Sequence, residues 1–305
     1  MQIGILEPKD FSNKALDMLN SIGEVTLFDG KDLDKYIADK EILFIRLAYF
    51  IDKNFLQKTK NLRYICTPTT GLNHIDLEEC EKKQIEIVSL KGEYMFLSSI
   101  RATPEHTIGL VLSLLRNYKD AFLTGNNPHW DREMHKGFEL YENSVGIIGF
   151  GRVGKILAKY LKAFGSKTYF NDTDDSIQEI HGAIKLPTPE DVINKSNIVI
   201  LSASYTESNY QFFDKKKIRL LKNKYFINTA RGELVDEEYL IEKIDQNFFK
   251  GLALDVIRNE QSNNNLDKLL KLVEKTNLII TPHLAGATYS SMHRTEEFIV
   301  NKLRV

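Results

Sequence analysis

One glycine-rich segment constrains the fold of this chain more than any other feature. The apolar run Val145–Ile148 leads into Gly149-Phe-Gly151-Arg-Val-Gly154, and a helical pattern with Ile156, Leu157, Tyr160 and Leu161 follows. In a G-x-G-x-x-G sequence the first glycine permits a tight turn, the second lets the backbone approach a diphosphate, and the third lets the helix pack close to the strand. The helix N-terminus adds unpaired N–H groups and the positive end of a dipole. The segment therefore predicts a strand–turn–helix unit whose dinucleotide-binding residues are Gly149, Gly151, Arg152, Val153 and Gly154.

An acidic residue at the end of the next apolar strand narrows the choice of dinucleotide. Asp172 follows Tyr169-Phe-Asn171, about 20 residues beyond the glycine turn, and no arginine comes after it. A carboxylate at this place accepts hydrogen bonds from ribose hydroxyls and repels a 2′-phosphate. The sequence therefore favours NAD over NADP.

The glycine segment has two other interpretations. Its spacing to Lys155 resembles a phosphate-binding P-loop, but Ile156 occupies the position where that motif needs a hydroxyl for Mg²⁺. The P-loop is therefore excluded. A glycine turn that binds nothing is the remaining alternative, and the strand, the helix and the acid around it argue against this.

The length of the chain and its apolar pattern predict two α/β domains. A chain of 305 residues corresponds to about two domains. Short strands alternating with helices indicate parallel sheets covered on both faces. The expected strands are Ile3–Leu6, Val25–Phe28, Ile42–Ile45, Tyr64–Cys66 and Ile85–Val88, then Ser144–Gly149, Thr168–Phe170, Ile198–Leu201, Tyr225–Asn228, Leu252–Asp255 and Leu278–Thr281.

Four helical patterns bear on how the domains are organised. Asp10–Ser21 and Glu233–Ile244 are amphipathic helices within the two alternations. Pro104–Leu115 is strongly apolar and is expected to connect the domains or to pack in a dimer. Thr288–Leu303 follows the second alternation and is expected to return to the first domain.

Charge, cysteine content and the N-terminus exclude several classes of protein. The 41 basic and 42 acidic residues leave a net charge of −1, so neither a nucleic-acid-binding surface nor an acidic tail is expected. Two cysteines cannot form a disulfide scaffold, which favours a reducing compartment. The sequence has no signal-peptide pattern and no apolar stretch long enough for a membrane span, so we expect a cytoplasmic protein. His129 and His135 match no known metal-binding pattern, and no metal is expected.

Three residues whose side chains could act together in one reaction follow three of the predicted strands. Arg231 comes after Tyr225–Asn228, Glu260 after Leu252–Asp255, and His283 after Leu278–Thr281. Because ligands bind outside the carboxyl ends of parallel strands, the three side chains are expected to converge.

The three residue types suit hydride transfer between a 2-hydroxyacid and a nicotinamide. His283 would be the general acid/base, and Arg231 would clamp the substrate carboxylate. Glu260 would orient the imidazole and favour its protonated form. A structural histidine and a surface ion pair are the alternatives at these positions.

Several sequence blocks in the same order resemble the D-isomer-specific 2-hydroxyacid dehydrogenase family, which includes phosphoglycerate dehydrogenases. The blocks are Thr70–Asp76, Ala102–Thr107, Trp130–Arg132, Gly146–Gly154, Asn228–Asp236, Ala253–Val256 and Thr281–Thr288. The resemblance implies an α/β fold with two Rossmann-like, doubly wound parallel-sheet domains and the active site in the cleft between them. It implies a discontinuous, flavodoxin-like substrate-binding domain (1–99 plus 287–305), an NAD-binding domain (100–286) and a homodimer.

The resemblance also implies roles for individual residues. Arg231, Glu260 and His283 would be the catalytic residues of an enzyme that interconverts a D-2-hydroxyacid and its 2-keto acid. The substrate would be bound by Arg46, Thr70, Gly71, Leu72 and Arg231, and the cofactor also by Thr107, Ala230, Asp255 and Gly286.

Departures from the family pattern keep alternatives open. Arg258 and Gln261 stand where members commonly have an acid and a proline around the catalytic glutamate, so a more mobile loop is expected. Thr67 stands where phosphoglycerate-specific members often have arginine. A D-3-phosphoglycerate dehydrogenase is therefore an alternative that is not favoured. Proteins of other classes are also alternatives, namely a non-catalytic NAD-sensing protein of the same fold and an adenosylhomocysteinase-type hydrolase.

Overall fold

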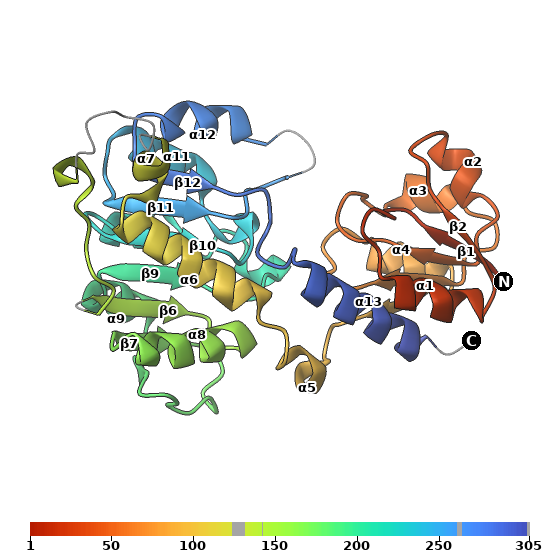
Figure 1. The fold of residues 1–305 in the computed structure, drawn as a ribbon, viewed down its shortest axis with the longest axis horizontal. Helices are drawn as coiled ribbons and strands as arrows, with labels where there is room; N and C mark the ends of the chain where they lie inside the picture. The colour runs from red at the N-terminus through yellow and green to blue at the C-terminus, as the bar shows by residue number, and fades with distance from the viewer. Residues whose placement is uncertain (124–131, 142, 261–263, 304–305) are drawn as a thin grey trace. The chain divides into compact units, whose positions relative to one another are not determined.

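The computed structural model of the chain describes residues 1–123, 132–141, 143–260 and 264–303, in two compact units (Figure 1). Unit 1 contains Met1–Ile100 and Ala287–Val305, and unit 2 contains Arg101–Gly286. Unit 1 has a five-stranded sheet and unit 2 a seven-stranded sheet, and every strand pair is parallel. The predicted fold class, two doubly wound α/β parallel-sheet domains, is confirmed.

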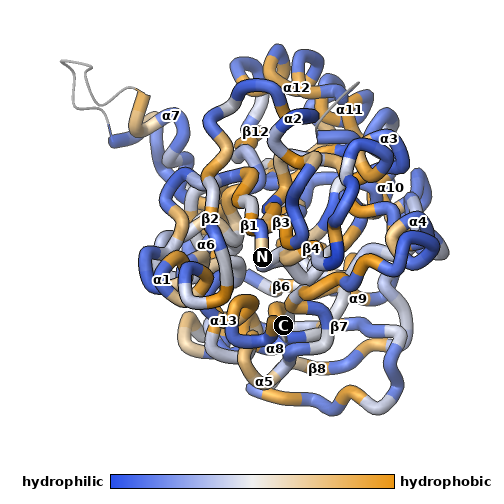
Figure 2. The backbone as a smooth tube through the Cα atoms, turned by 90° about the vertical axis from the view of Figure 1, so that its right-hand side faces the viewer, coloured by the Kyte–Doolittle hydropathy of each residue, from blue (hydrophilic) through white to orange (hydrophobic). Residues whose placement is uncertain are grey.

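Unit 1 has the strand order β2-β1-β3-β4-β5, which is the flavodoxin-like order. Its strands are β1 (Gln2–Ile5), β2 (Glu24–Leu27), β3 (Ile42–Phe44), β4 (Tyr64–Thr67) and β5 (Glu86–Ser89). Its helices are α1 (Asn13–Asn20), α2 (Leu33–Ile37), α3 (Lys53–Gln57), α4 (Leu77–Lys82), α5 (Tyr94–Leu97) and α13 (Tyr289–Lys302). In Figure 2 the central strands of this sheet carry hydrophobic colours, whereas α4 is mostly hydrophilic.

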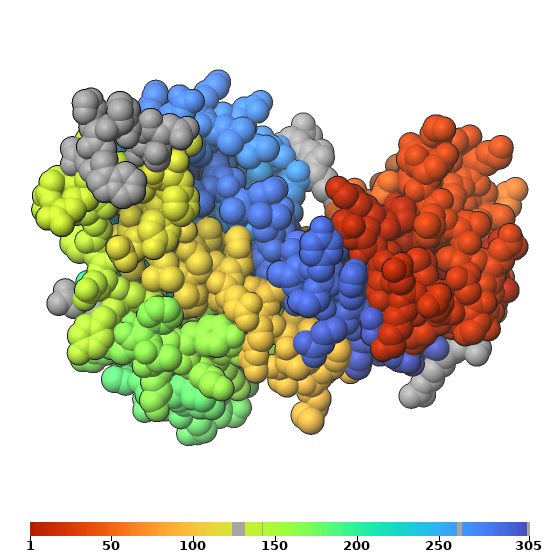
Figure 3. Space-filling view, viewed as in Figure 1, coloured from red at the N-terminus to blue at the C-terminus, as the bar shows by residue number. Residues whose placement is uncertain are grey.

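Both faces of the unit 1 sheet are buried because side chains alternate along each strand. Ile3, Ile5 and Phe44 belong to one apolar cluster, whereas Leu43 and Ile45 belong to the cluster on the opposite face. Helix α13 contributes Ile299 and Val300 to the first cluster, Leu303 directly after it belongs to the same cluster, and the helix packs against α1, β4 and β5. Figure 3 shows the residues of α13, in blue, against those of α1, in red. The C-terminal helix therefore completes the core of unit 1.

Unit 2 has the strand order β12-β11-β10-β9-β6-β7-β8, with the reversal between β6 and β9 that is typical of a Rossmann sheet. Its strands are β6 (Ser144–Ile148), β7 (Lys167–Asn171), β8 (Ile184–Lys185), β9 (Ile198–Leu201), β10 (Tyr225–Asn228), β11 (Gly251–Leu254) and β12 (Leu278–Ile280). Its α-helices are α6 (Ala102–Leu115), α7 (Tyr118–Leu123), α8 (Arg152–Ala163), α9 (Pro189–Lys195), α10 (Lys215–Leu220), α11 (Glu237–Asp245) and α12 (Leu266–Val273). Short 3₁₀ helices lie at η1 (Glu133–His135), η2 (Glu207–Asn209) and η3 (Gly232–Leu234).

One helix of unit 2 differs from the sequence-based expectation. The segment predicted as one helix, Glu233–Ile244, is divided into η3 and α11, because the side chain of Asp236 accepts the Tyr239 N–H and starts a new helix. Helix α6 buries Leu110, Val111 and Leu114 and packs against β10, β11 and α8 (Figure 1). It is therefore a core helix of unit 2. In the described ranges, none of the helices has the length and apolar character that crossing a bilayer requires.

Candidate active site

The glycine turn lies where the strand order of the unit 2 sheet reverses, between β6 and β9. Gly149 has a φ of +90°, a conformation that side chains disfavour, and its N–H donates to the Asn171 carbonyl. A Cβ at Gly149 would overlap with the backbone of Ala203, the second residue after β9. A Cβ at Gly154 would lie 2.6 Å from the Gly149 carbonyl oxygen. The turn therefore has no room for side chains at these two positions, as the motif requires.

The start of α8 presents positive charge next to this turn. Nothing lies within 4 Å of a Cβ placed on Gly151, so the backbone there is open to a ligand. Arg152 is the first residue of α8, and Val153 packs against the core below it. Burial and the neighbouring charge of Arg101 lower the pKa of Arg152. Two guanidinium groups that repel each other at a helix N-terminus fit a bound diphosphate.

Asp172 is joined directly to the glycine turn. Its Oδ2 accepts the Phe150 N–H at 2.5 Å, and its Oδ1 accepts the Asp174 N–H at 3.0 Å. The carboxylate therefore lies at the end of β7 beside the turn, where a ribose diol would meet it. The residues at this edge of the sheet fit a dinucleotide.

A short turn after β10 carries Arg231. The buried side chain of Asn228 holds this turn, accepting the Ala230 N–H and donating to the Arg231 carbonyl, both at 3.0 Å. Burial lowers the pKa of Arg231, while the charges of Glu260 and Glu233 act in the opposite direction. An arginine remains protonated under such conditions. Arg231 is thus a half-buried cation close to the carboxylate of Glu260.

Glu260 and His283 form a hydrogen-bonded pair. The Glu260 Oε2 atom lies 2.7 Å from the Nδ1 atom of His283, and both side chains are only partly exposed. Because Nδ1 is held by the carboxylate, Nε2 is the nitrogen that can exchange a proton with a ligand. The structure therefore brings together the carboxylate and the imidazole that the sequence predicted as partners.

The turn that carries His283 is held by the buried carboxylate of Asp255. His283 has a φ of +53°, and its N–H donates to the Asp255 main-chain carbonyl at 2.8 Å. The Asp255 carboxylate accepts four further hydrogen bonds, from the Leu284 N–H (2.8 Å), the Ala285 N–H (2.9 Å), the Thr281 hydroxyl (2.5 Å) and the His106 ring, whose Nε2 lies 3.2 Å away. Asp255 thus fixes the left-handed turn on which His283 sits.

The hydrogen bonds also keep Asp255 ionised. Burial acts to raise its pKa, but the donors on His106, Thr281 and the loop backbone outweigh burial, and the pKa of Asp255 is lowered. A stable buried anion thus organises the end of β11. The contact with the nicotinamide carboxamide predicted for this residue stays a prediction.

Gly232 allows the loop after β11 to lie directly on the Arg231 turn. A Cβ at Gly232 would overlap with the carbonyl carbon of Ile257 and the nitrogen of Arg258. These are backbone atoms, so a side chain would push apart the two segments that carry Arg231 and Glu260. A glycine is required here for close approach.

Substituting Gly232 by alanine should therefore damage both stability and activity. We expect the free energy of unfolding to fall by about 1–3 kcal/mol, as for other overpacked sites, with a large loss of turnover. Urea denaturation and steady-state kinetics would measure the two effects. Gly109→Ala is the matched control, because a Cβ there meets nothing within 4 Å and alanine favours the helix. Equal behaviour of the two variants would contradict this account.

Thr107, Ala230 and Gly286 are the remaining residues of unit 2 that are predicted to contact the cofactor. Thr107 is fully buried in α6, and its hydroxyl contacts the Thr229 hydroxyl at 2.9 Å and the Thr103 carbonyl at 2.8 Å. Ala230 lies in the turn before Arg231, and Gly286 is exposed at the end of the unit. Their contacts with a cofactor stay predictions.

The loop after β4 of unit 1 contains the predicted carboxylate-binding amides. The Thr69 hydroxyl donates to the Gly71 carbonyl at 2.9 Å and stiffens the loop. Within the described chain, no residue accepts a hydrogen bond from the N–H groups of Thr70, Gly71 or Leu72. Successive N–H groups of this kind are available to an anion.

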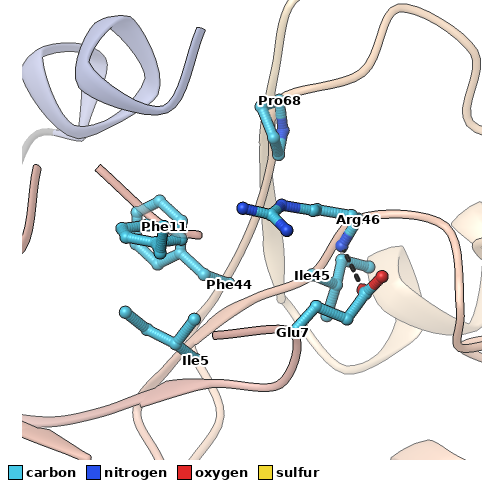
Figure 4. Close-up of a pocket in the computed structure, with 7 residues that line it drawn as sticks. All are labelled: Ile5, Glu7, Phe11, Phe44, Ile45, Arg46 and Pro68. Carbon is cyan, nitrogen blue, oxygen red and sulfur yellow. Dashed lines mark hydrogen bonds between the residues drawn. The ribbon is translucent and has the colours of Figure 1, made fainter. Parts of the chain in front are cut away.

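Arg46, predicted as a substrate contact, is engaged inside unit 1. Its Nε and Nη2 atoms bind the Glu296 carboxylate at 3.1 and 2.5 Å, and its Nη1 binds the Lys9 carbonyl at 2.9 Å. Figure 4 shows Arg46 together with the other residues that line a small hollow, namely Ile5, Glu7, Phe11, Phe44, Ile45 and Pro68. The guanidinium therefore has a structural role, and its substrate contact stays a prediction.

His129 and Trp130 lie outside the described residues, in the range 124–131. His129 is, with His135, one of the two histidines considered as metal ligands, and Trp130 belongs to the third block that resembles the family. The predicted absence of a metal is likewise untested.

Comparisons with known proteins show what the chain as a whole is similar to. The chain is 28% identical over 302 residues to the glyoxylate reductase of Thermofilum pendens, covering 94% of this chain and 86% of the relative. It is 27% identical over 305 residues to the hydroxypyruvate reductase of Thermotoga maritima, covering 99% and 97%. The structure of D-lactate dehydrogenase from Aquifex aeolicus, complexed with NAD and lactic acid, matches with a TM-score of 0.85 at 25% identity, covering 99% and 94%.

A family-level match covers most of unit 2. Residues 108–285 match the NAD-binding domain of the D-isomer-specific 2-hydroxyacid dehydrogenases. The match includes the glycine turn, Asp172 and the strand ends that carry Arg231, Glu260 and His283, and it confirms NAD as the predicted cofactor. The chain belongs to the D-isomer-specific 2-hydroxyacid dehydrogenase family.

Proposed function

We propose that this protein is an NAD-dependent dehydrogenase that interconverts a D-2-hydroxyacid and its 2-keto acid. The observation that carries the proposal is the Glu260–His283 pair at 2.7 Å, formed at the carboxyl edge of an NAD-binding sheet with the cationic Arg231 nearby. An acid/base group and a carboxylate anchor are the two protein functions that such a reaction needs.

The roles of the side chains follow from their contacts. NADH, held at the glycine turn and by Asp172, would supply the hydride that reduces C2 of the keto acid. The Nε2–H of protonated His283 donates a proton to the carbonyl oxygen, so that a hydroxyl forms as C2 is reduced. Glu260 stabilises the imidazolium before transfer, and Arg231 holds the substrate carboxylate through a bidentate hydrogen bond. In oxidation His283 accepts the proton instead.

Unit 1 is proposed as the substrate-binding domain. The N–H groups of Thr70, Gly71 and Leu72 are suited to a carboxylate, and Arg46 is occupied by Glu296. We therefore propose these amides as the contacts that unit 1 offers to a substrate carboxylate. The cytoplasmic location stays a prediction.

A panel of keto acids tests the proposed activity. Glyoxylate, hydroxypyruvate, pyruvate and 3-phosphohydroxypyruvate would each be mixed with enzyme and NADH, and loss of NADH absorbance followed. Oxidation of NADH with at least one of the small keto acids is expected, because two of the relatives named above are a glyoxylate reductase and a hydroxypyruvate reductase. NADH binding without oxidation across the panel would overturn the proposal and favour the NAD-sensing protein.

Removing the carboxylate of Asp172 should relax cofactor discrimination. In Asp172→Ala we expect the ratio of the NADPH and NADH dissociation constants to fall about tenfold, or ~1.4 kcal/mol, because a 2′-phosphate no longer meets a fixed anion. Fluorescence titration with both cofactors measures this ratio. Asp175→Asn is the control, since Asp175 is a fully exposed neighbour. An unchanged ratio in Asp172→Ala would rule out this role.

A homodimer is proposed as the state in solution. Large apolar side chains are exposed on and near α7 and η1, at Phe122, Leu123, Met134 and Phe138. Exposed apolar groups clustered in this way indicate a surface that another copy covers. Light scattering should give a mass about twice the 35.1 kDa of the chain, whereas a mass of one chain would contradict the proposal.

A further inference from the structure

A second buried carboxylate, Glu237, holds the loop that carries Glu260. Glu237 is the first residue of α11 and is 3% exposed. Its Oε2 accepts the Arg258 N–H at 2.7 Å, and its Oε1 accepts the Asn265 side-chain amide at 2.9 Å. Burial raises the pKa of Glu237, while these hydrogen bonds act in the opposite direction. A carboxylate is costly at this depth without such donors.

The two donors lie on either side of Glu260 in the chain. Arg258 precedes it by two residues, and Asn265 follows it before α12 begins. A single side chain therefore fixes both ends of the loop. This contact explains why Glu237 is buried at a helix start, where a carboxylate would ordinarily face solvent.

The neighbouring Glu238 binds the same two residues, Arg258 and Asn265. Its Oε1 accepts the Asn265 amide at 2.9 Å and lies 3.3 Å from Nη2 of Arg258, while its Oε2 lies 3.3 Å from Lys268. The Arg258 side chain thus has a partner on the helix that also binds its main-chain N–H. Together, Glu237 and Glu238 bind the main-chain N–H of Arg258 and the side chains of Arg258 and Asn265.

The contact with Arg258 bears on Glu260 because only Asn259 separates the two residues in the chain. Glu260 is therefore placed by a backbone segment whose N–H group at Arg258 is held by the buried carboxylate of Glu237.

We propose that Glu237, assisted by Glu238, is a positioning residue that keeps the Glu260 carboxylate on Nδ1 of His283. The inference rests on the proposed function for its kinetic consequence, but the contact itself does not. A shift of about 1 Å in Glu260 would weaken the stabilisation of the imidazolium and slow proton transfer.

The first test needs no substrate. Glu237→Ala, Glu260→Gln and the parent protein would be prepared with isotope-labelled histidine, and the Nδ1–H proton of His283 observed by NMR. A hydrogen bond to a carboxylate moves the resonance of its proton downfield, so losing the bond moves the resonance upfield. We expect Glu260→Gln to move the resonance upfield, Glu237→Ala to move it in the same direction, and the double variant to match Glu260→Gln.

The second test is kinetic and uses the keto acid that the panel identifies. Glu237→Ala should lower kcat about tenfold in the parent background, leave KM nearly unchanged, and cause no further loss on top of Glu260→Gln. Asp214→Ala is the control, because it removes an N-cap carboxylate of α10 in the same unit, bonded to the Lys217 N–H, without touching the loop. If Glu237→Ala is too unstable to study, Glu237→Gln keeps an oxygen for the Arg258 N–H and should give an intermediate shift.

The outcomes separate this inference from the proposed activity. An unchanged Nδ1–H resonance of His283 in Glu237→Ala, or a loss of kcat that is equally large in the Glu260→Gln background, would overturn the positioning role. An inactive parent enzyme whose His283 Nδ1–H resonance still responds to Glu237→Ala would overturn the proposed activity and leave the positioning role standing.

Discussion

Replacing His283 is expected to lower kcat by about 10²–10⁴-fold, the usual contribution of a general acid/base, while the dissociation constant for NADH stays the same. His283 is bonded through Nδ1 to Glu260 and through its N–H to Asp255, so Nε2 is left to exchange the proton. Neither contact lies in the glycine turn that is proposed to bind the cofactor. Steady-state kinetics and fluorescence titration of NADH would separate the two effects.

The choice of substitution matters because of the backbone at this position. With a φ of +53°, alanine would add a conformational cost to the loss of the ring. Asparagine tolerates the left-handed conformation, so His283→Asn removes the acid/base with less disturbance of the turn. His293→Ala is the control, since His293 bonds the Asp10 carbonyl in unit 1. Retained turnover in His283→Asn would show that another group transfers the proton.

The largest effect on stability is expected at Glu296, on the C-terminal helix. Its carboxylate is 0% exposed and accepts hydrogen bonds from Arg46 and from the Ser12 N–H, which lies 2.8 Å from Oε2. Removing it leaves a guanidinium without its counter-charge and a backbone N–H without its acceptor, both inside unit 1. Breaking a buried ion pair in this way costs about 3–5 kcal/mol.

Urea denaturation of Glu296→Ala would measure this cost, and hydrogen exchange would show whether α13 loosens first. Glu297→Ala is the matched control one residue along. Its carboxylate binds Lys14, which is largely exposed, and accepts the Ser12 hydroxyl, and exposed ion pairs contribute at most about 1 kcal/mol. A free energy of unfolding within about 1 kcal/mol of the parent in Glu296→Ala would contradict the structural role of the ion pair.

Local patterns were sufficient to predict most of the fold. The strands β9 and β10 match the predicted residues, because continuous apolar runs between polar segments specify buried parallel strands. The glycine turn could also be predicted from the sequence, because its geometry depends on residues that are adjacent in the chain. The sequence did not indicate the two-residue strand β8, because Ile184–Lys185 contains no apolar run. Strand β8 lies at the edge of the sheet, where it pairs only with β7.

Contacts between residues that are distant in the chain were harder to predict from the sequence than local structure. The Glu260–His283 pair was predictable because parallel strands end at one edge of a sheet, so residues after two such strands meet. The partner of Arg46 lies 250 residues away on α13, and nothing near Arg46 in the sequence indicates it. Glu237 was missed for a similar reason, since an acidic residue at a helix start ordinarily indicates only a favourable dipole contact.

Transfer of a labelled hydride tests the central claim most directly. The protein would be incubated with a keto acid whose reduced product is chiral, such as hydroxypyruvate, and with NADH deuterated at the C4 position that transfers hydride. The account predicts a D-2-hydroxyacid with deuterium at C2. A product without deuterium at C2, or the L enantiomer, would contradict it.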